Sequence, residues 1–198
     1  MHIADGVLTP EITAVITAVS AIAFYKAIKT IKEEEIALAA VASAMFFIAS
    51  FIHIPFGVTQ IHLILLGVIG IFLGIRSFIS VLIALILQAL LLGYGGVVSI
   101  GVNLFVMAAP AVIVYHINKT EIFQKINEKI RFFLIGFLGA FFETLFLVAI
   151  LYFSKAEYEW AAYSIFTVNI FTMIIEGFVS MFLLMFIKKT YPKILENK

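Results

Sequence analysis

The chain has 198 residues, of which 64% are hydrophobic and 13% are charged, and its formal net charge is +1. Soluble domains average about half apolar and a quarter charged residues, so a soluble domain of this size is excluded and much of the chain must face lipid. The near-neutral charge excludes a nucleic-acid binder, which needs a dense basic surface. The absence of cysteine excludes disulfides, thiolate metal sites and cysteine nucleophiles.

The apolar runs are continuous rather than alternating, which predicts membrane-spanning helices instead of a transmembrane barrel. The fold class is therefore all-α, a polytopic membrane helix bundle of about seven spans of about 20 residues each. Thr9 and Pro10 form a suitable beginning for the first span. The spans cover approximately residues 10–25, 36–52, 61–75, 77–93, 101–117, 132–153 and 165–187. An alternative remains for residues 61–93: one kinked helix with a re-entrant piece, which would give six spans.

The basic residues fall almost entirely on alternate connections between these spans. That set holds 12 of the 13 Lys and Arg residues, namely Lys26, Lys29, Lys32, Arg76, Lys119, Lys125, Lys129, Arg131, Lys188, Lys189, Lys193 and Lys198. Only Lys155 lies on the other connections. Cytoplasmic loops carry the excess of Lys and Arg, so we expect the N-terminus outside and the C-terminus in the cytoplasm.

One transmembrane domain is expected over residues 1–198. It consists of an extracytoplasmic N-terminal segment (1–9), the helix bundle (10–187) and a cytoplasmic tail (188–198). The first ten residues contain no Lys or Arg, unlike the basic start of a signal peptide, so we expect the mature protein to keep its N-terminus.

His2 can bind a metal ion together with the end of the chain. The α-amino group of Met1, the peptide nitrogen of His2 and its imidazole Nδ1 close one five-membered and one six-membered chelate ring, nearly in one plane. Such planar nitrogen ligation favours Ni(II) or Cu(II), with Co(II) a third candidate. The alternative is a chance histidine in a frayed terminus. The apolar residues Ile3, Val7 and Leu8 instead predict a segment that folds back into the mouth of the bundle.

Two further histidines, His53 and His62, flank a loop on the same predicted side as His2. Either imidazole can supply a fourth in-plane nitrogen, and the alternative for each is a hydrogen-bonded structural role.

Glu143 and Glu176 lie within the predicted sixth and seventh spans. Each is either a protonated group hydrogen-bonded to Asn103, Asn169 or a backbone carbonyl, or a group that compensates metal charge or relays protons. The sequence holds no His-Glu-x-x-His, Gly-x-Ser-x-Gly or Walker motif, so we do not expect an enzyme, and ATP hydrolysis would need another chain.

These residues resemble the CbiM/NikM family, the substrate-capture components of energy-coupling-factor transporters for cobalt and nickel. Met-His-Ile-Ala-Asp-Gly at positions 1–6 is similar to the start of that family, and Thr-Gln-Ile-His-Leu at 59–63 is similar to its Thr-Ser-x-His-Leu element. Its Gln-Ala-Leu, His-Gly-Gly and Gly-Ala-Asn elements are resembled by residues 88–90, 94–96 and 101–103, followed by Met107. Tyr94 departs from the family, which often has His there.

The resemblance implies that the N-terminal segment enters the bundle from outside. The Met1 amine, the His2 amide and imidazole, and the His62 imidazole would then bind Co(II) or Ni(II), which favours His62 over His53. The ion would be the transported substrate and not a cofactor. Tyr94 alters any polar shell at its position.

The resemblance also implies partners: a membrane coupling subunit, which would contact the small residues Ala40 and Ala44, and two cytoplasmic ATPase subunits. The protein would be a multi-pass protein of the cell membrane, connected with nickel use or cobalamin biosynthesis. Residues 1–198 do not include the extra accessory segment of some nickel members, so cobalt versus nickel, and a separate small accessory membrane protein, stay open as expectations.

Two other functions remain as alternatives. A capture component for a vitamin-like organic ligand would use the aromatic side chains of Phe56, Tyr94 and Trp160 to line a cavity. An intramembrane enzyme would use Glu143, Glu176 and a histidine, and the missing motifs count against it.

Overall fold

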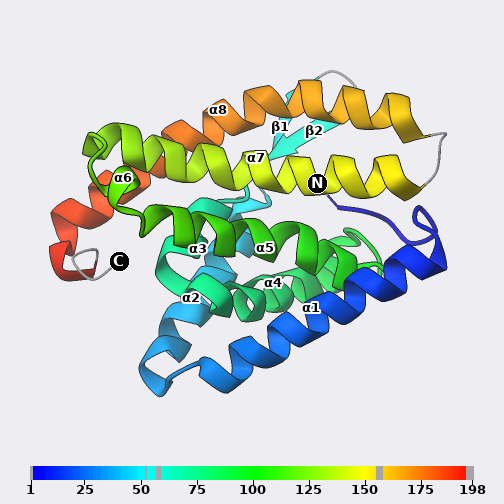
Figure 1. Cartoon of the computed structure of the whole chain (residues 1–198), viewed down its shortest axis with the longest axis horizontal. Helices are drawn as coiled ribbons and strands as arrows, with labels where there is room; N and C mark the ends of the chain where they lie inside the picture. The colour runs from blue at the N-terminus through cyan, green and yellow to red at the C-terminus, as the bar shows by residue number, and fades with distance from the viewer. Residues whose placement is uncertain (1, 52, 57–58, 155–157, 195–198) are drawn as a thin grey trace.

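The computed structural model describes residues 2–51, 53–56, 59–154 and 158–194, and for 53–56, 59–62, 159 and 193 it describes the backbone alone. The chain forms a bundle of helices with one small hairpin (Figure 1). The helices are α1 (Pro10–Thr30), α2 (Glu33–Ala49), α3 (Leu66–Leu73), α4 (Ser77–Leu92), α5 (Ile100–Asn118), α6 (Glu121–Gln124), α7 (Glu128–Ser154) and α8 (Glu159–Thr190). The 3₁₀ turns η1 (Gly74–Arg76) and η3 (Pro192–Ile194) and the antiparallel strands β1 (His53–Phe56) and β2 (Thr59–His62) complete the fold.

Local sequence signals explain where the first two helices begin. Thr9 is extended and Pro10 occupies the first turn of α1, as predicted, because the fixed φ of proline suits that position. At α2 the Glu35 carboxylate accepts the backbone N–H of Lys32 at 3.0 Å. This contact satisfies a donor that the start of a helix otherwise leaves without a partner.

The prediction of a helical membrane bundle is confirmed, and among the described residues fewer than seven helical stretches have the length of a span. Among the described residues, five helical stretches are long and apolar enough to cross a membrane. They are Pro10–Thr30, Leu66–Leu92, Ile100–Asn118, Glu128–Ser154 and Trp160–Thr190. The chain is therefore a multi-pass membrane protein.

The predicted second and third spans account for the difference. α2 ends at Ala49 after 17 residues, and residues 61 and 62 belong to β2. α3 has eight residues and is about 12 Å long, whereas a bilayer core is about 30 Å thick. α3 alone is therefore too short to cross the bilayer and is counted together with η1 and α4 in the stretch Leu66–Leu92, which is closer to the kinked, re-entrant alternative than to two full spans.

The chain reverses between α3 and α4 at η1. Gly74 has φ +53°, a left-handed conformation that glycine adopts without strain, and its Cα faces the Tyr115 ring. Arg76 donates a hydrogen bond to the Thr30 carbonyl (3.1 Å) and lies 3.1 Å from the Glu35 carboxylate. The turn is thus fixed to the connection between α1 and α2, and α4 leads back towards the opposite end of the bundle (Figure 1).

Glycines allow the central helices to cross at very short distances. A Cβ atom on Gly67 of α3 would overlap the carbonyl group of Ile135 in α7, and one on Gly139 of α7 would overlap the backbone of Gly67. On the next face of α7, a Cβ on Gly136 would overlap the Glu176 carbonyl in α8. Small residues at such crossings let backbones approach, which is how helices in lipid gain packing energy.

Several basic residues lie at one end of the bundle. Lys29 is in the last turn of α1, Lys188 is in the last turn of α8, and Lys119 follows α5. Lys188 also pairs with Glu128 at the start of α7, and the four helix ends lie towards the same end of the bundle (Figure 1). Which membrane side this end faces remains the charge-based prediction made above.

Alanine at Gly67 or Gly139 should destabilise the bundle by about 1–3 kcal/mol, because the added methyl group meets backbone that cannot move aside. The measurement is the thermal unfolding midpoint of the detergent-solubilised protein. Ala40→Val, which enlarges an exposed position of α2, is the control. Equal midpoints for all three variants would contradict the close crossing.

Candidate functional site

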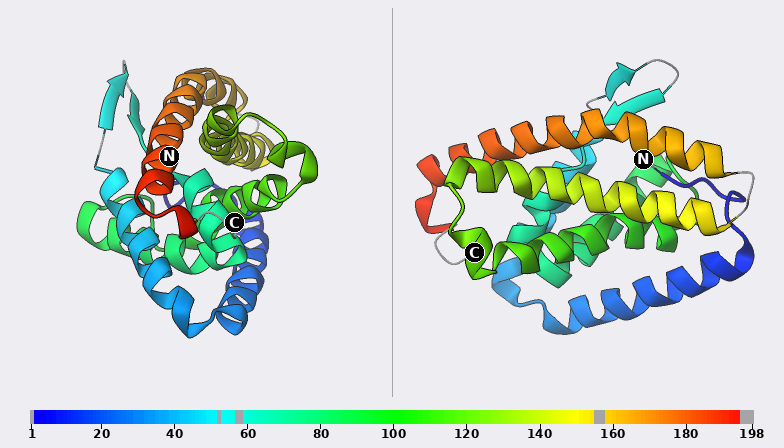
Figure 2. Two further views of the ribbon diagram at one scale, coloured as in Figure 1. Left: turned by 90° about the vertical axis from the view of Figure 1, so that its left-hand side faces the viewer. Right: turned by 45° about the horizontal axis from the view of Figure 1, so that its top comes forward.

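The N-terminal segment, residues 2–8, is folded onto the end of the bundle where α4 ends and α5 begins (Figure 2). Ile3 and Leu8 are 4% and 8% exposed. Both pack in a cluster with Val102 and Val106 of α5 and with residues of α7. The prediction that the apolar residues of this segment fold back into the bundle is therefore confirmed.

Asn103 of α5 holds the backbone of this segment. Its Oδ1 accepts the Ile3 N–H at 2.8 Å, and its Nδ2 donates to the Ile3 carbonyl at 2.9 Å. One buried amide thus satisfies both polar backbone groups of a buried residue, as a neighbouring strand would, and avoids the cost of leaving them unpaired.

Asp5 joins the same segment to the beginning of α5. Its carboxylate accepts the Ser99 N–H at 2.8 Å and the Val98 N–H at 3.3 Å, and the Ser99 hydroxyl lies 2.8 Å from Oδ1. These hydrogen bonds, first that of the Ser99 hydroxyl, lower the pKa of Asp5 below its usual value. A carboxylate placed here also compensates the positive end of the helix dipole.

Gly95 and Gly96 make room for the N-terminal segment. A Cβ on Gly96 would overlap the Asp5 carboxylate, and one on Gly95 would lie 3.0 Å from Nδ2 of Asn103 and 3.6 Å from Cβ of His2. Gly95 also has φ +73°, which L side chains rarely adopt. The Gly-Gly pair thus has a physical role, since any side chain there would displace residues 2–5.

His2 is oriented by a side chain of α4. Its Nε2 lies 2.8 Å from Oε1 of Gln88, which is fully buried. The amide oxygen can only accept, so Nε2 carries the proton and Nδ1 keeps its lone pair. Burial lowers the pKa of His2 to about 4 against the opposing effect of the Gln88 hydrogen bond. The ring is therefore neutral near pH 7, which is the form that binds metals.

Tyr94 lies beside this imidazole, with ring centroids 5.8 Å apart and planes inclined by 42°. The family that this chain resembles often has a histidine at this position, where this chain has the phenol ring of Tyr94. Among the described residues, His2 thus contacts an aromatic ring and the amide of Gln88.

The other predicted ligands are only partly described. Met1 lies outside the described residues. His62 ends β2, and its Cα is paired in register with that of His53 in β1, but the side chains of both lie outside the description. Among the described residues, no group of three or more His, Asp or Glu side chains forms a metal site. That His2 and His62 bind the same metal ion therefore remains a prediction.

Glu176 has partners different from those predicted. Its carboxylate accepts the backbone N–H groups of Ile64 and Leu65 rather than the side-chain amide of Asn103 or Asn169. The Asn169 amide instead donates to the Ile165 carbonyl within α8 (2.9 Å). The Asn103 amide pairs with the backbone of Ile3. Glu143 is equally buried, and the Thr144 hydroxyl lies 3.4 Å from its carboxylate.

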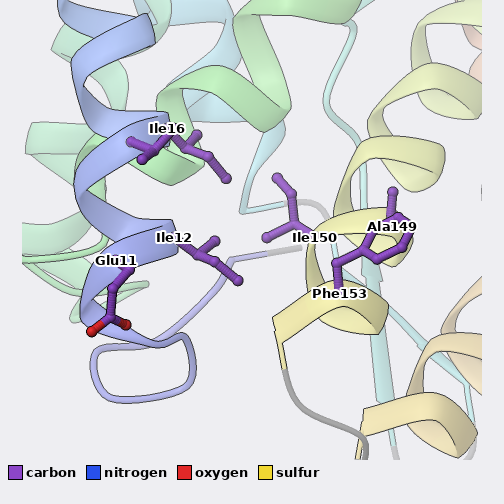
Figure 3. Close-up of a pocket in the computed structure, with 7 residues that line it drawn as sticks. Glu11, Ile12, Ile16, Ala149, Ile150 and Phe153 are labelled. Atoms are coloured by element: carbon purple, nitrogen blue, oxygen red, sulfur yellow. The ribbon is translucent and has the colours of Figure 1, made fainter.

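A separate groove of about 400 Å³ lies between α1 and α7 (Figure 3). Its lining is apolar except for Glu11 and includes Ile12, Ile16, Ile150 and Phe153. A site for an organic ligand needs a few convergent polar groups to orient it. Neither Tyr94, which lies at His2, nor Trp160, which is 84% exposed, belongs to this lining.

Sequence reasoning from chemistry alone did not find Gln88, Asn103 or Asp5 as functional residues. Their only signal was the resemblance of residues 1–6, 88–90 and 101–103 to family elements. Pairing a side chain with the backbone of a segment about 100 positions away leaves no local pattern in the sequence.

Comparison with known proteins gives a consistent result. The family model CbiM, described as the cobalt uptake substrate-specific transmembrane region, matches residues 2–194. A Haemophilus influenzae protein with a metal-transport name is 41% identical over 133 residues, 66% of this chain and 64% of that protein. The cobalt transport protein CbiM of Lachnoclostridium phytofermentans is 35% identical over 72% of this chain and 60% of its own length.

Two solved structures have the same fold. A transition metal transporter superposes with a TM-score of 0.80 at 26% identity, covering 96% of this chain and 93% of that one. A truncated transition metal transporter superposes with a TM-score of 0.79 at 25% identity, covering 96% and 99%. This chain spans just under two thirds of the length of the curated relatives named above.

Replacing Asn103 with Ala should release the N-terminal segment, because both backbone groups of Ile3 lose their buried partners at a cost of about 1–3 kcal/mol. The chain has no cysteine, so a nitroxide on Ala4→Cys reports on this segment alone. We expect a slow spectral component in the parent and a larger fast component after Asn103→Ala. Unchanged spectra, with Asn169→Ala as the control, would contradict the role of Asn103.

Proposed function

This chain belongs to the CbiM family of cobalt-uptake substrate-specific transmembrane proteins, and on that premise we propose that it captures Ni(II) or Co(II) for import. Like its relatives it is a transport component and not an enzyme. The observation that carries the metal site is the pairing of His2 with Gln88. Because Nε2 carries the proton in that pair, Nδ1 is the ring nitrogen that would coordinate the ion together with the end of the chain.

The proposed ligands are four nitrogens: the Met1 amine, the His2 amide and Nδ1, and the His62 imidazole. The first three are close in sequence and form fused chelate rings, so docking the segment presents them together. His62 supplies the fourth nitrogen of the plane. Planar nitrogen ligation of this kind suits Ni(II) or Cu(II), so of the two ions that the family resemblance implies it favours Ni(II) over Co(II).

Gln88 supports this ligand set in the way that other proteins support metal-bound histidines. A partner on the second ring nitrogen fixes the tautomer and the ring orientation. Asn103 and Asp5 support it in turn, since they fix the backbone from which the His2 ring projects. The neutral ring at physiological pH means that no imidazole proton must leave when the ion binds.

Transport itself needs energy that this chain does not supply. We propose that it works with a membrane coupling subunit and two cytoplasmic ATPase subunits, as its family resemblance implies, with the ion taken up outside. The exposed small residues Ala40 and Ala44 of α2 are the proposed contact with the coupling subunit. A small accessory membrane protein is a further candidate partner.

The runner-up function, capture of a vitamin-like ligand, has less support. Two of its three proposed aromatic residues, Tyr94 and Trp160, occupy unrelated places, and the groove between α1 and α7 has an apolar lining. The buried polar side chains at the N-terminal segment hold backbone and an imidazole, which suits a small ion better than an organic molecule.

His2→Ala and His62→Ala should each weaken Ni(II) binding more than about 100-fold, because losing a ligand costs more than losing its supporting residue. One residue added before Met1 should do the same, because it moves the histidine to position three and changes the chelate rings. Isothermal titration of the purified protein with Ni(II) and Co(II) measures this. Unchanged affinity in the extended chain would rule out ligation by the N-terminus even if metal still bound.

Gln88→Leu should weaken Ni(II) binding by about 10- to 100-fold, because the imidazole loses the partner that fixes its tautomer. The matched control is Ser80→Ala, which removes another buried polar group of α4, one that donates to Ala39 at 2.9 Å and not to the N-terminal segment. The same titration applies. Equal losses in both variants would show a general effect of altering α4 and not an effect on His2.

A further inference from the structure

Glu176 is a buried carboxylate in the middle of α8 that holds backbone instead of another side chain. It is 1% exposed. The Ile64 N–H donates to Oε1, and the Leu65 N–H lies 3.2 and 3.0 Å from Oε1 and Oε2. A buried carboxylate is costly unless its oxygens are hydrogen-bonded, so this contact must form when α8 packs.

The backbone it holds has an unusual conformation. Leu65 has φ +55°, and it is the only non-glycine residue in the described part of the chain with a positive φ. Such a conformation costs free energy for a residue with a side chain and persists only where the surroundings fix it. Leu65 also precedes the first turn of α3, where N–H groups lack helical partners and a negative charge is favourable.

The helices around this contact leave Glu176 little freedom. Gly136 of α7 lies directly against the Glu176 carbonyl, and Gly139 and Gly67 bring α7 against the start of α3. α3, α7 and α8 therefore meet within two turns of the carboxylate. A shift of α8 must be transmitted to residues 64 and 65.

His62 is separated from the held backbone by a single residue. That residue, Leu63, is buried with Ala49 and Leu65 in a small cluster. Its packing therefore fixes the connection between His62 and Ile64. Two peptide units span at most about 7 Å, so the Cα of His62 must lie within that distance of the Ile64 Cα. The contact made from α8 thus limits where the backbone of His62 can lie.

We propose that Glu176 is a positioning residue for His62: it holds the Ile64–Leu65 turn and so places the imidazole for the ion. This inference rests on the proposed function, because it assumes that His62 is a ligand. It assigns α8 a role in the metal site although α8 contributes no ligand. In this proposal Glu176 acts through the backbone that it holds and is not one of the four ligands.

The test uses the full chain in detergent, with Ni(II) as the probe and the visible ligand-field absorption band as the readout. Removing one of four planar nitrogens weakens the ligand field and moves the band to lower energy. We expect Glu176→Ala to bind Ni(II) about 10- to 100-fold more weakly and to show the band of His62→Ala. Combined with His62→Ala, it should add no further loss, because both changes remove one interaction.

Two more variants keep the test decisive. Glu176→Gln retains one acceptor oxygen, so a less than tenfold loss and a partial shift of the band are expected even if Glu176→Ala does not fold. Asn169→Ala removes another polar group of α8, whose bond stays within that helix, and should leave the band unchanged.

Three outcomes would overturn the proposal. A wild-type band in both Glu176 variants, while His62→Ala shifts it, would reject positioning and leave the proposed function standing. A loss in Glu176→Ala that persists in the His62→Ala background would indicate general destabilisation. If His62→Ala itself keeps the wild-type band and affinity, the ligand set of the proposed function fails and this inference fails with it.

Discussion

The candidate site depends on one contact, the pairing of the Asn103 amide with both backbone groups of Ile3. A non-helical segment beside a membrane would otherwise stay in water, because burying its peptide groups without partners costs about 1–3 kcal/mol for each group. Asn103 removes that cost at the position where the segment enters the bundle. Asp5 on one side and Gln88 on the other then fix residues 2–5, and the glycines at 95 and 96 leave the space they need.

The same arrangement recurs at the second half of the proposed site. There the Glu176 carboxylate holds the backbone of Ile64 and Leu65, close to His62. In both places a short non-helical segment is held by one buried side chain from a long helix, α5 for the first and α8 for the second. On this account the distance between the two proposed ligand groups is set by how α5 and α8 pack against α7, and a change in that packing would change the affinity for the ion.

Such coupling fits a protein that must bind an ion tightly and later release it. Planar ligation by four nitrogens tolerates little displacement, because each nitrogen must lie near one plane. Small movements between helices would therefore weaken the site strongly. The close glycine crossings of α3, α7 and α8 resist such movements in the isolated chain, so we expect release to need work from a partner.

The sequence was sufficient to predict the helical membrane bundle, the start of α1 at Pro10 and the folding back of Ile3 and Leu8, because these follow from local composition. The region around His62 was predicted less well. Residues 61–75 are apolar throughout, and hydropathy alone does not distinguish a full span from a strand, a left-handed turn and an eight-residue helix. The partners of Glu176 could not be predicted either, since backbone N–H groups exposed by a distant turn have no signature in the sequence.

The central claim is that the chain end and two imidazoles bind the ion. X-ray absorption at the nickel edge of the loaded, purified protein tests it most directly, because multiple scattering from imidazole rings counts the histidines around the metal. We expect a four-coordinate shell of nitrogen alone, with two imidazoles, and one imidazole after His62→Ala. A six-coordinate shell dominated by oxygen, or a shell without imidazole, would contradict it.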